Sequence, residues 1–572
     1  MKILAVLGAL VLQAASVFAA TPADPPTARV IVGYREGAAL AVAHPWHKGA
    51  SALDVQRASQ RRADALTQRA GVSLTTGRAI GQRAQVLMAR GIDSATLARR
   101  LAADPNVAYA VVDQRRRALT GPNDPLFSAG PTVNLQTLTG GPEVGQWYLR
   151  APDSTFRSAT NAQAAWAKST GVGVVVAVLD TGVLANHVDL AGQVLAGYDF
   201  VRDTGTANDG DGRDADASDP GDWVTAAENA SGPFKDCGES DSSWHGTHVA
   251  GIIAAATHNG IGMAGMAYGA KVLPVRVLGK CGGYDSDIQA GMLWAAGVDQ
   301  AGLPGSATPA KVLNMSLGGE GACTASYQDT MASVTARGAV VVAAAGNSVG
   351  RAVGTPANCP GIIAVAGVRH AGSKVGFSDL GPEIAIAAPG GNCVNIEPGT
   401  PCLYPILTLS NSGLRAPVAG GWIYTDSFDI SVGTSFATPM VAATAALMLS
   451  LRPDLTPAQV KSALQSSARA FPTSGADNGP SDPTPVGVCQ PPSSQEQLQC
   501  YCVTGLCGAG MLDAAAAITA AEAVPRPVAP VTPPAGGGGG GALSWPWLLA
   551  LALGAALLSA GRRPSARPAR RR

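Results

Sequence analysis

The feature that most constrains the fold is the stretch GTSFATPMVAATAALMLSL at residues 433–451. Its alanine, methionine, valine and leucine side chains leave no charged face, so the stretch predicts a helix buried inside the protein. Arg452 and Pro453 mark its end, because proline cannot continue a helix. A chain of 572 residues, of which 46% are hydrophobic and 14% charged, has enough apolar material to surround this helix with one large core.

Ser435 lies at the N-terminal end of this predicted helix. The first turn of a helix carries unpaired N–H groups and the positive end of the helix dipole, which stabilise a negative charge developing on a reacting oxygen. A serine hydroxyl alone is a poor nucleophile, and it needs a base together with an acid that orients the base. Ser435 as a nucleophile therefore requires a histidine and an aspartate elsewhere in the chain.

Suitable partners lie in two upstream stretches. GVGVVVAVLDTG, residues 171–182, predicts a parallel strand buried on both faces that ends in Asp180 and a Thr-Gly turn. Open α/β sheets carry their functional groups at this carboxyl end. HGTHVAG, residues 245–251, predicts the start of a second small-residue helix with His245 at its first position. Each feature alone is typical of a turn or a helix cap, but the three together favour a catalytic set.

The chain order Asp180, His245, Ser435 is the order of the catalytic triad in subtilisin. The blocks VLDTG, HGTHVAG and GTSFATPMVA resemble the active-site blocks of subtilisin-like serine peptidases, and the similarity runs through roughly residues 123–520. The resemblance implies an α/β fold in which a mainly parallel twisted sheet has helices on both faces. It also implies that Ser435 attacks the scissile carbonyl, that His245 transfers the proton, and that Asp180 orients His245.

The resemblance further assigns residues around the substrate. VVVAAAGN, residues 340–347, predicts an apolar strand, and Asn347 at its end resembles the residue whose side-chain amide completes the oxyanion hole. Because the implied cleft segments contain no charged residue, they predict tolerance for apolar or large neutral side chains, although Glu320 lies close to them in sequence. The resemblance implies that the substrate binds against Ser316, Leu317, Gly318, Gly354 and Ala357.

An insertion at residues 201–243 is rich in aspartate and glycine. Carboxylates on a flexible loop suit calcium, although the loop lacks the twelfth-position glutamate of an EF-hand, and a solvated acidic loop is the alternative. Asp189 and the loop NGIGM at residues 259–263 resemble calcium-binding positions of the family. No catalytic cofactor is expected, because HGTH lacks the glutamate of the HExxH zinc motif. The predicted ligands of a structural calcium ion are Asp189, Asp209, Asp211, Asp214 and Asp216.

All ten cysteines lie at or after Cys237. An even number confined to this part of the chain predicts disulfides formed in an oxidising compartment, with a metal site at the last cysteines as the alternative. Sequence alone does not determine the pairing. Local closure favours pairing Cys237 with Cys281, Cys323 with Cys359 and Cys393 with Cys402, which leaves Cys489, Cys500, Cys502 and Cys507 to pair among themselves.

The N-terminal part predicts an exported precursor. Residues 1–20 are typical of a secretory signal peptide. Residues 21–122 predict a small ferredoxin-like α+β unit that resembles the inhibitory propeptide of the family, and a permanent accessory domain is the alternative. Three arginines at residues 115–117 precede the predicted catalytic domain, residues 123–522, so maturation is expected near them. The predicted elements of the unit are strands at 28–34, 85–89 and 107–113 and helices at 50–70 and 94–102.

The C-terminal part predicts a membrane-directed tail. Residues 523–541 form a Pro/Gly-rich linker, residues 542–561 are apolar and long enough to span a bilayer, and residues 562–572 form an Arg-rich tail expected on the cytoplasmic side. This arrangement resembles the Gly-Gly carboxy-terminal sorting signals of Gram-negative bacteria. The resemblance implies cleavage by a rhomboid-type peptidase, and a permanent single-pass anchor is the alternative.

The sequence therefore predicts a secreted, calcium-stabilised serine endopeptidase that hydrolyses peptide bonds of extracellular proteins once its propeptide is removed. Its expected location is the cell surface or the extracellular medium, with transient or permanent anchoring at the C-terminus. The net charge of +1 argues against a nucleic-acid partner, and a monomer is expected. Two alternatives remain: a selective processing peptidase for exported proteins, and a catalytically silent surface-binding protein with the same fold.

Overall fold

The computed structural model describes residues 27–46, 49–114, 121–130, 144–392, 404–425, 432–475 and 485–526. These residues form two compact units, which divide between Thr120 and Gly121. The predicted signal peptide, membrane span and cytoplasmic tail lie outside the described residues, as does most of the predicted linker.

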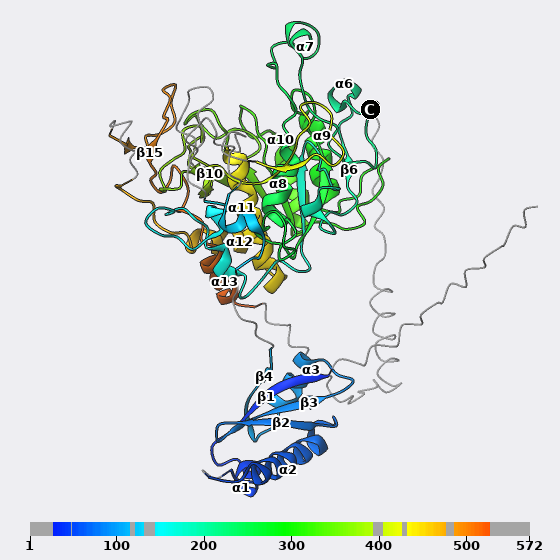
Figure 1. The fold of residues 1–572 in the computed structure, drawn as a ribbon, viewed down its shortest axis with the longest axis vertical. Helices are drawn as coiled ribbons and strands as arrows, with labels where there is room; N and C mark the ends of the chain where they lie inside the picture. The colour runs from blue at the N-terminus through cyan, green and yellow to red at the C-terminus, as the bar shows by residue number, and fades with distance from the viewer. Residues whose placement is uncertain are drawn as a thin grey trace, which may run out of the picture. The chain divides into compact units, whose positions relative to one another are not determined.

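The N-terminal unit is a four-stranded antiparallel sheet with helices packed on it (Figure 1). Its elements are β1 (Ala28–Tyr34), α1 (Ala39–Ala43), α2 (Ala52–Ala70), β2 (Thr75–Ile80), β3 (Ala84–Ala89), α3 (Ser94–Ala102) and β4 (Val107–Val112). The strand order is β2-β3-β1-β4. Strand β2 was not predicted, because its sequence TTGRAI contains glycine and arginine and none of its residues is buried. The other strands and the two longer helices lie where the sequence predicted them.

The larger unit is built on a seven-stranded sheet of order β11-β10-β9-β8-β5-β7-β6, in which every pair of neighbours is parallel. This confirms the predicted α/β fold with a mainly parallel sheet. The strands are β5 (Val175–Asp180), β6 (Tyr198–Asp199), β7 (Lys271–Arg276), β8 (Val312–Met315), β9 (Val340–Ala344), β10 (Ile363–Val368) and β11 (Ile384–Pro389).

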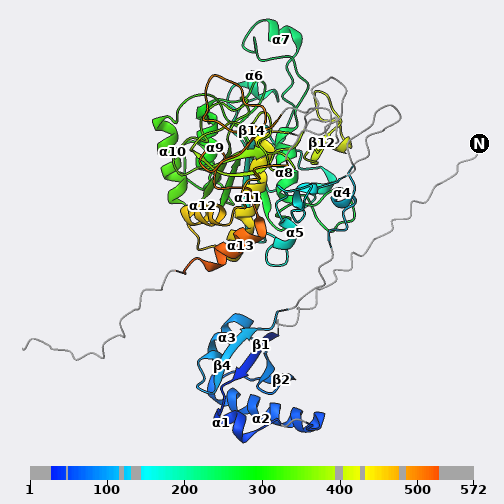
Figure 2. The same ribbon diagram turned by 90° about the vertical axis from the view of Figure 1, so that its left-hand side faces the viewer.

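Helices cover both faces of this sheet. The longer ones are α8 (His245–Ala254), α9 (Asp285–Ala295), α10 (Ala325–Ala336), α11 (Thr434–Leu451), α12 (Pro457–Ser466) and α13 (Ala514–Ala523). Figure 2 shows α9 and α10 on one side and α8 and α11 on the other. Successive residues of β5 point to opposite faces, so Val176 and Val178 join the core of α8, α11 and α13. Ala177 and Leu179 join the second core, with α9 and α10. Because β5 is buried on both faces, its sequence is apolar throughout and does not alternate with polar residues.

Helix α11 is the buried helix that the sequence predicted. It begins at Thr434, ends at Leu451, and buries fifteen of its eighteen residues. Among the described residues it is the one helix long and apolar enough to cross a membrane, but 89% of its apolar window is buried inside the protein. Its apolar character therefore belongs to the core of the larger unit.

Shorter elements complete the larger unit. They are α4 (Pro125–Ser128), the 3₁₀ turn Trp147–Leu149, α5 (Ala162–Ala165), the 3₁₀ turn Val188–Leu190, α6 (Thr204–Ala207), α7 (Ala226–Ala230), β12 (Leu409–Asn411), β13 (Trp422–Tyr424), β14 (Gly487–Val488) and β15 (Cys500–Tyr501). Strands β12 and β13 form an antiparallel pair, and the loop between them contacts the segment before α8.

Four disulfides are present in the described residues. Cys237 pairs with Cys281 and Cys323 with Cys359, which confirms two of the expected local closures. The last four cysteines pair among themselves, as Cys489–Cys500 and Cys502–Cys507. The sulfurs of Cys489, Cys502 and Cys507 lie within 4.8 Å of one another, but all three are in disulfides, so they do not offer a thiolate metal site. The expected pair Cys393–Cys402 lies outside the described residues.

Candidate active site

The candidate site lies where the chain changes direction across the sheet. Strand β5 has β7 on one side and β8 on the other, so the connection from β7 to β8 crosses β5. A crevice forms at such a switch point beyond the carboxyl ends of the strands. Asp180 is the last residue of β5, and Ser316 directly follows β8.

Asp180 and His245 form a hydrogen-bonded pair. The Nδ1 atom of His245 lies 2.7 Å from Oδ1 of Asp180, which also accepts the N–H of Thr181. The carboxylate is completely buried, whereas the side chain of His245 is 22% exposed. The second oxygen, Oδ2 of Asp180, is buried and accepts no hydrogen bond in the described structure. An aspartate at Nδ1 favours the tautomer that carries its proton there, and it leaves Nε2 free to act as a base.

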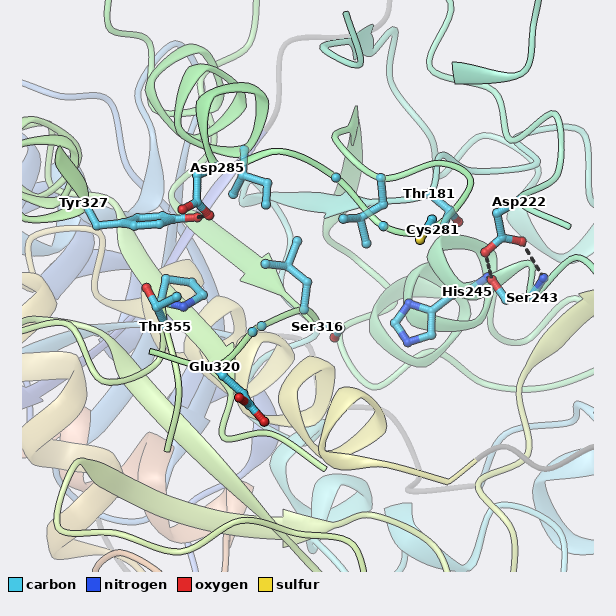
Figure 3. A pocket seen from close by; sticks show the side chains of 18 residues that line it. Thr181, Asp222, Ser243, His245, Cys281, Asp285, Ser316, Glu320, Tyr327 and Thr355 are labelled. Atoms are coloured by element: carbon cyan, nitrogen blue, oxygen red, sulfur yellow. Dashed lines mark hydrogen bonds between the residues drawn. The ribbon is translucent and has the colours of Figure 1, made fainter. Parts of the chain in front are cut away.

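The turn before α8 presents His245 to the cleft. Trp244 is the N-cap and adopts a left-handed conformation with φ 50°, which is unusual for a bulky residue. It is held there because its side chain is 3% exposed and its indole N–H donates to the carbonyl of Gly413. Asp222 supports the same turn by accepting the N–H and the hydroxyl of Ser243, at 2.6 and 2.7 Å. Figure 3 shows Asp222 bound to Ser243 beside His245.

Opposing effects act on the pKa of His245. Burial disfavours the imidazolium and lowers the pKa, but the negative charges of Asp180, Asp222 and Asp219, together with the hydrogen bond that Asp180 accepts from Nδ1, outweigh burial and raise the pKa. His248, one helical turn further, has its pKa lowered to about 3 by burial and by the charge of His245. His248 is therefore neutral, and its Nε2 lies 3.2 Å from the hydroxyl of Ser410.

Ser435 lies in the first turn of α11, next to His245. Gly433 before the helix has φ 151° and ψ 161°, a region essentially reserved for glycine. The ring of Phe436 lies edge-on to the ring of His245 with centroids 5.8 Å apart. The hydroxyl of Ser435 donates to the carbonyl of Ser316 at 3.1 Å, and no hydrogen bond joins Ser435 to His245 among the described residues. Catalytic hydrogen bonds are often long or poorly aligned until substrate is bound.

Asn347 points a donor toward the same helix end. Its Oδ1 accepts the backbone N–H and the hydroxyl of Thr434, at 3.0 and 2.9 Å. Because a backbone N–H can only donate, the accepting atom must be the amide oxygen, and the NH₂ group makes no hydrogen bond within the described residues. This Nδ2 atom lies close to Gly433, where an added Cβ would come within 3.5 Å of it. Its amide group therefore lies beside Ser435 with hydrogen-bond capacity to spare.

The comparisons with known proteins agree with this geometry. A sequence model of the subtilase family matches residues 171–487, more than half of the chain. The chain belongs to the subtilase family.

Two curated relatives and one solved structure are similar to this subtilase over much of its length. An extracellular protease of Xanthomonas campestris pv. campestris is 40% identical over 499 residues, which are 86% of this chain and 73% of that protein. An extracellular basic protease of Dichelobacter nodosus is 38% identical over 377 residues, 65% of this chain and 56% of that protein. A protease from Pseudoalteromonas arctica has 40% sequence identity and a TM-score of 0.55, and the match covers 70% of this chain and 100% of that one. This subtilase is a serine endopeptidase.

The cleft of the subtilase contains two cavities that share the segment 318–320. The first, about 550 Å³, has His245, Ser316 and Leu317 in its lining (Figure 3). The second, about 810 Å³, is lined by Asn347 and Gly354 among others. Four of the five predicted substrate-binding residues thus line one cavity or the other, whereas Ala357 lines neither and is 2% exposed.

The cleft is not free of charge, contrary to the expectation from its segments. Carboxylates from separate parts of the chain line the two cavities, together with one guanidinium: Asp222, Asp285, Glu320, Arg351, Asp379 and Glu383. Only Glu320 was suspected from the sequence, because it directly follows a cleft segment. The others lie outside the motifs, Asp285 at the start of α9 and the rest in loops, and nothing in their local sequence marks them as cleft residues.

The predicted calcium ligands of the acidic insertion are not brought together. In the described residues, no three Asp, Glu or His side chains converge as ligands. Asp209 instead pairs with the buried guanidinium of Arg276, which also binds Asp199. The carboxylates of Asp214 and Asp216 accept N–H groups two residues further along the chain, which is typical of turns.

Asp189 lies in a different environment that fits a cation. It is completely buried, and its carboxylate accepts the side-chain N–H of Asn259 at 2.7 Å and the N–H of Met263 at 2.8 Å. Burial raises its pKa to about 6, and the negative charge of Asp124 adds to the rise. Asp124, which the sequence did not single out, is 2% exposed and accepts the N–H of His258. The two buried carboxylates are hard oxygen donors of the kind that calcium prefers, whereas Asn259 presents its NH₂ group to Asp189 and its oxygen accepts the N–H of Ile261.

Proposed function

We propose that Asp180, His245 and Ser435 form the catalytic triad of this serine endopeptidase. Ser435 Oγ attacks the carbonyl carbon of the scissile bond while His245 Nε2 takes its proton, and the carbonyl oxygen becomes an oxyanion. His245 then returns the proton to the leaving amine as the C–N bond breaks. Water hydrolyses the acyl-enzyme by the same route. The observation that carries this proposal is the 2.7 Å bond between His245 and the buried Asp180, beside the N-terminus of α11.

We propose that the Asn347 side chain and the Ser435 backbone N–H bind the oxyanion. The Asn347 amide is oriented by its two contacts with Thr434, so its NH₂ group does not need to reorganise during the reaction. A pre-oriented donor of this kind stabilises charge that develops only in the transition state.

The subtilase is proposed to be exported as a precursor. The secretory signal at residues 1–20 and the disulfides support export, and two of its relatives are named extracellular proteases. The compact N-terminal unit supports the role of residues 21–122 as an inhibitory propeptide, followed by the catalytic domain. The C-terminal span and arginine-rich tail support sorting to the surface with cleavage by a rhomboid-type peptidase.

Calcium is proposed to bind at Asp189 rather than in the acidic insertion. Asp189 and Asp124 would hold the ion, which would neutralise the two buried carboxylates and stabilise the loop at residues 259–263. The ion takes no part in the reaction. Asp209 remains paired with Arg276.

Casein hydrolysis by the full chain, expressed into an oxidising compartment, tests these proposals. Wild type is expected to release the N-terminal unit and digest casein, whereas Ser435→Ala stays as an uncut, inactive precursor. Ser450→Ala, at the far end of the same helix, is the matched control and should behave as wild type. A calcium chelator should lower the thermal stability of purified Ser435→Ala protein, and unchanged stability would remove calcium from the proposal. Equal casein digestion by Ser435→Ala and wild type would overturn the triad.

A further inference from the structure

The larger cavity receives the substrate side chain just before the cleaved bond. If Asn347 holds the oxyanion, as proposed above, then the carbonyl of that residue lies at Asn347, and its side chain enters the cavity that Asn347 lines. The cavity has a volume of about 810 Å³, enough for a long side chain. This assignment rests on the proposed function.

The walls of this cavity are lined by small residues, and its charged groups are mainly acidic. Three carboxylates line it, and one guanidinium, that of Arg351, does so as well. The guanidinium is partly engaged elsewhere, because its Nη1 donates to the carbonyl of Ser493 at 3.0 Å. The balance of charge around an entering side chain is therefore negative.

The carboxylates differ in their freedom to meet a substrate. Asp379 is 2% exposed, and its Oδ1 accepts the N–H groups of Ser348 and Arg351, so it forms a fixed part of the wall. Glu320 and Glu383 are exposed, and neither takes part in an ion pair within the described residues. Glu383 folds over Gly381, where an added Cβ would come within 2.5 Å of its Oε2.

We propose that Glu320 and Glu383 are specificity-determining residues that make this subtilase prefer lysine or arginine immediately before the cleaved bond. An ammonium or guanidinium entering the cavity would find two unpaired carboxylates above the buried Asp379. A glutamate in the same place would be repelled. Glu320 also lines the first cavity, so its charge acts on a second substrate position, whereas Glu383 lines the larger cavity alone.

The test uses peptides that differ only in the residue before the cleaved bond: Lys, Gln, Leu or Glu. We expect kcat/KM for the Lys peptide to exceed that for the Gln peptide, with the Glu peptide lowest. Glu320→Gln and Glu383→Gln should each lower the Lys-to-Gln ratio roughly two- to fivefold, as expected for one partly solvated ion pair. Raising the salt concentration should lower the ratio in wild type, because it screens exposed charges. Glu239→Gln, exposed and outside both cavities, is the matched control and should leave the ratio unchanged.

Each outcome has a distinct meaning. A wild-type Lys-to-Gln ratio at or below one overturns the proposal, and so does a ratio that the double variant Glu320→Gln/Glu383→Gln does not change. If the Lys-to-Gln ratio is at or below one while wild type cleaves the Leu peptide and Ser435→Ala does not, the basic preference is wrong and the triad stays intact. If wild type cleaves none of the peptides although the propeptide has been released, the proposed function itself fails.

Discussion

Two polar regions of the molecule meet at Thr181 and are built in opposite ways. On one side, among the described residues, Asp180, Ser435 and Asn347 keep unused hydrogen-bond capacity: a buried carboxylate oxygen, a hydroxyl held at 3.1 Å and an amide NH₂ group. On the other side is a saturated network, in which each of the three nitrogen atoms of the Arg276 guanidinium already donates a hydrogen bond. The four acceptors are the carboxylates of Asp199 and Asp209 and the carbonyls of Ala207 and Thr181.

The difference separates reactivity from stability. Unused donors and acceptors are costly when buried, and they persist where a substrate will complete them. In the saturated network every guanidinium nitrogen already has an acceptor, and these bonds hold the insertion against strands β6 and β7. Substitutions in the first region should therefore change catalysis, and substitutions in the second should change folding.

Asp180→Asn should have the largest effect. The variant keeps the shape of the side chain, but it favours the wrong tautomer of His245 and removes the charge that stabilises the imidazolium. We expect kcat on a peptide substrate to fall about 10⁴-fold. Thermal unfolding, measured in the Ser435→Ala background to prevent autolysis, should change little. A loss of less than tenfold in kcat would contradict the role proposed for Asp180.

Arg276→Met, in the second region, should lower the stability of the fold. It leaves the completely buried Asp199 without its partner, and we expect the free energy of unfolding to fall by about 3–5 kcal/mol. Denaturant unfolding in the Ser435→Ala background measures the loss. Arg213→Met is the matched control, because its side chain is 25% exposed and should cost less. Equal losses for the two variants would show that the saturated network does not stabilise the fold.

Asn347→Asp, in the first region, should lower the catalytic rate. The variant keeps an oxygen to accept the N–H of Thr434, but it loses the NH₂ donor and brings a negative charge toward the oxyanion. We expect kcat to fall about 10²–10³-fold, the range found when one oxyanion donor is removed. Thr434→Val removes the hydroxyl contacts to Asn347 and Gly346 but keeps the backbone N–H contact to Asn347, so it should cost much less. A rate loss in Asn347→Asp no larger than in Thr434→Val would exclude Asn347 from the oxyanion hole.

The same contrast explains what could be predicted from the sequence. Asp180 ends an apolar strand, and His245 and Ser435 each begin a small-residue helix, so local patterns locate all three. By contrast, no local sequence pattern shows which residues will pair with a charged side chain. Arg276 pairs with Asp209, which is 67 residues away in the sequence, and nothing in the sequence indicated this pairing when Asp209 was predicted as a calcium ligand.

The charged residues of the cleft walls and one strand of the N-terminal sheet also could not be predicted from local sequence patterns. The cavity beside Asn347 is lined by carboxylates from loops around residues 320 and 379–383. These loops are far apart in the sequence, and only the folded sheet brings them together. Strand β2 escaped prediction because it is held by pairing with β3 rather than by an apolar pattern of its own. Local periodicity therefore predicted the buried elements, and tertiary contacts determined the rest.

The smallest effect is expected at Asp222, which lies between the two regions. Asp222→Asn keeps an acceptor for the N–H of Ser243 and removes a charge that raises the pKa of His245. His245 must be neutral to accept the proton of Ser435, so activity is lost as the pH falls through this pKa. Lowering the pKa should move the acidic limb of the pH profile of kcat/KM to lower pH, and the plateau at higher pH should change little.

Two controls make this shift specific. Asp241→Asn removes an exposed carboxylate close to His245 in sequence that is not among the charges acting on its pKa, so its acidic limb should coincide with that of wild type. High salt should shrink the difference between wild type and Asp222→Asn, because the charge acts partly through solvent. A shift to higher pH, or a loss of the plateau without a shift, would mean that Asp222 acts by holding the turn at Ser243 rather than by its charge. Asp222 would then belong with Arg276 in the region that stabilises the fold.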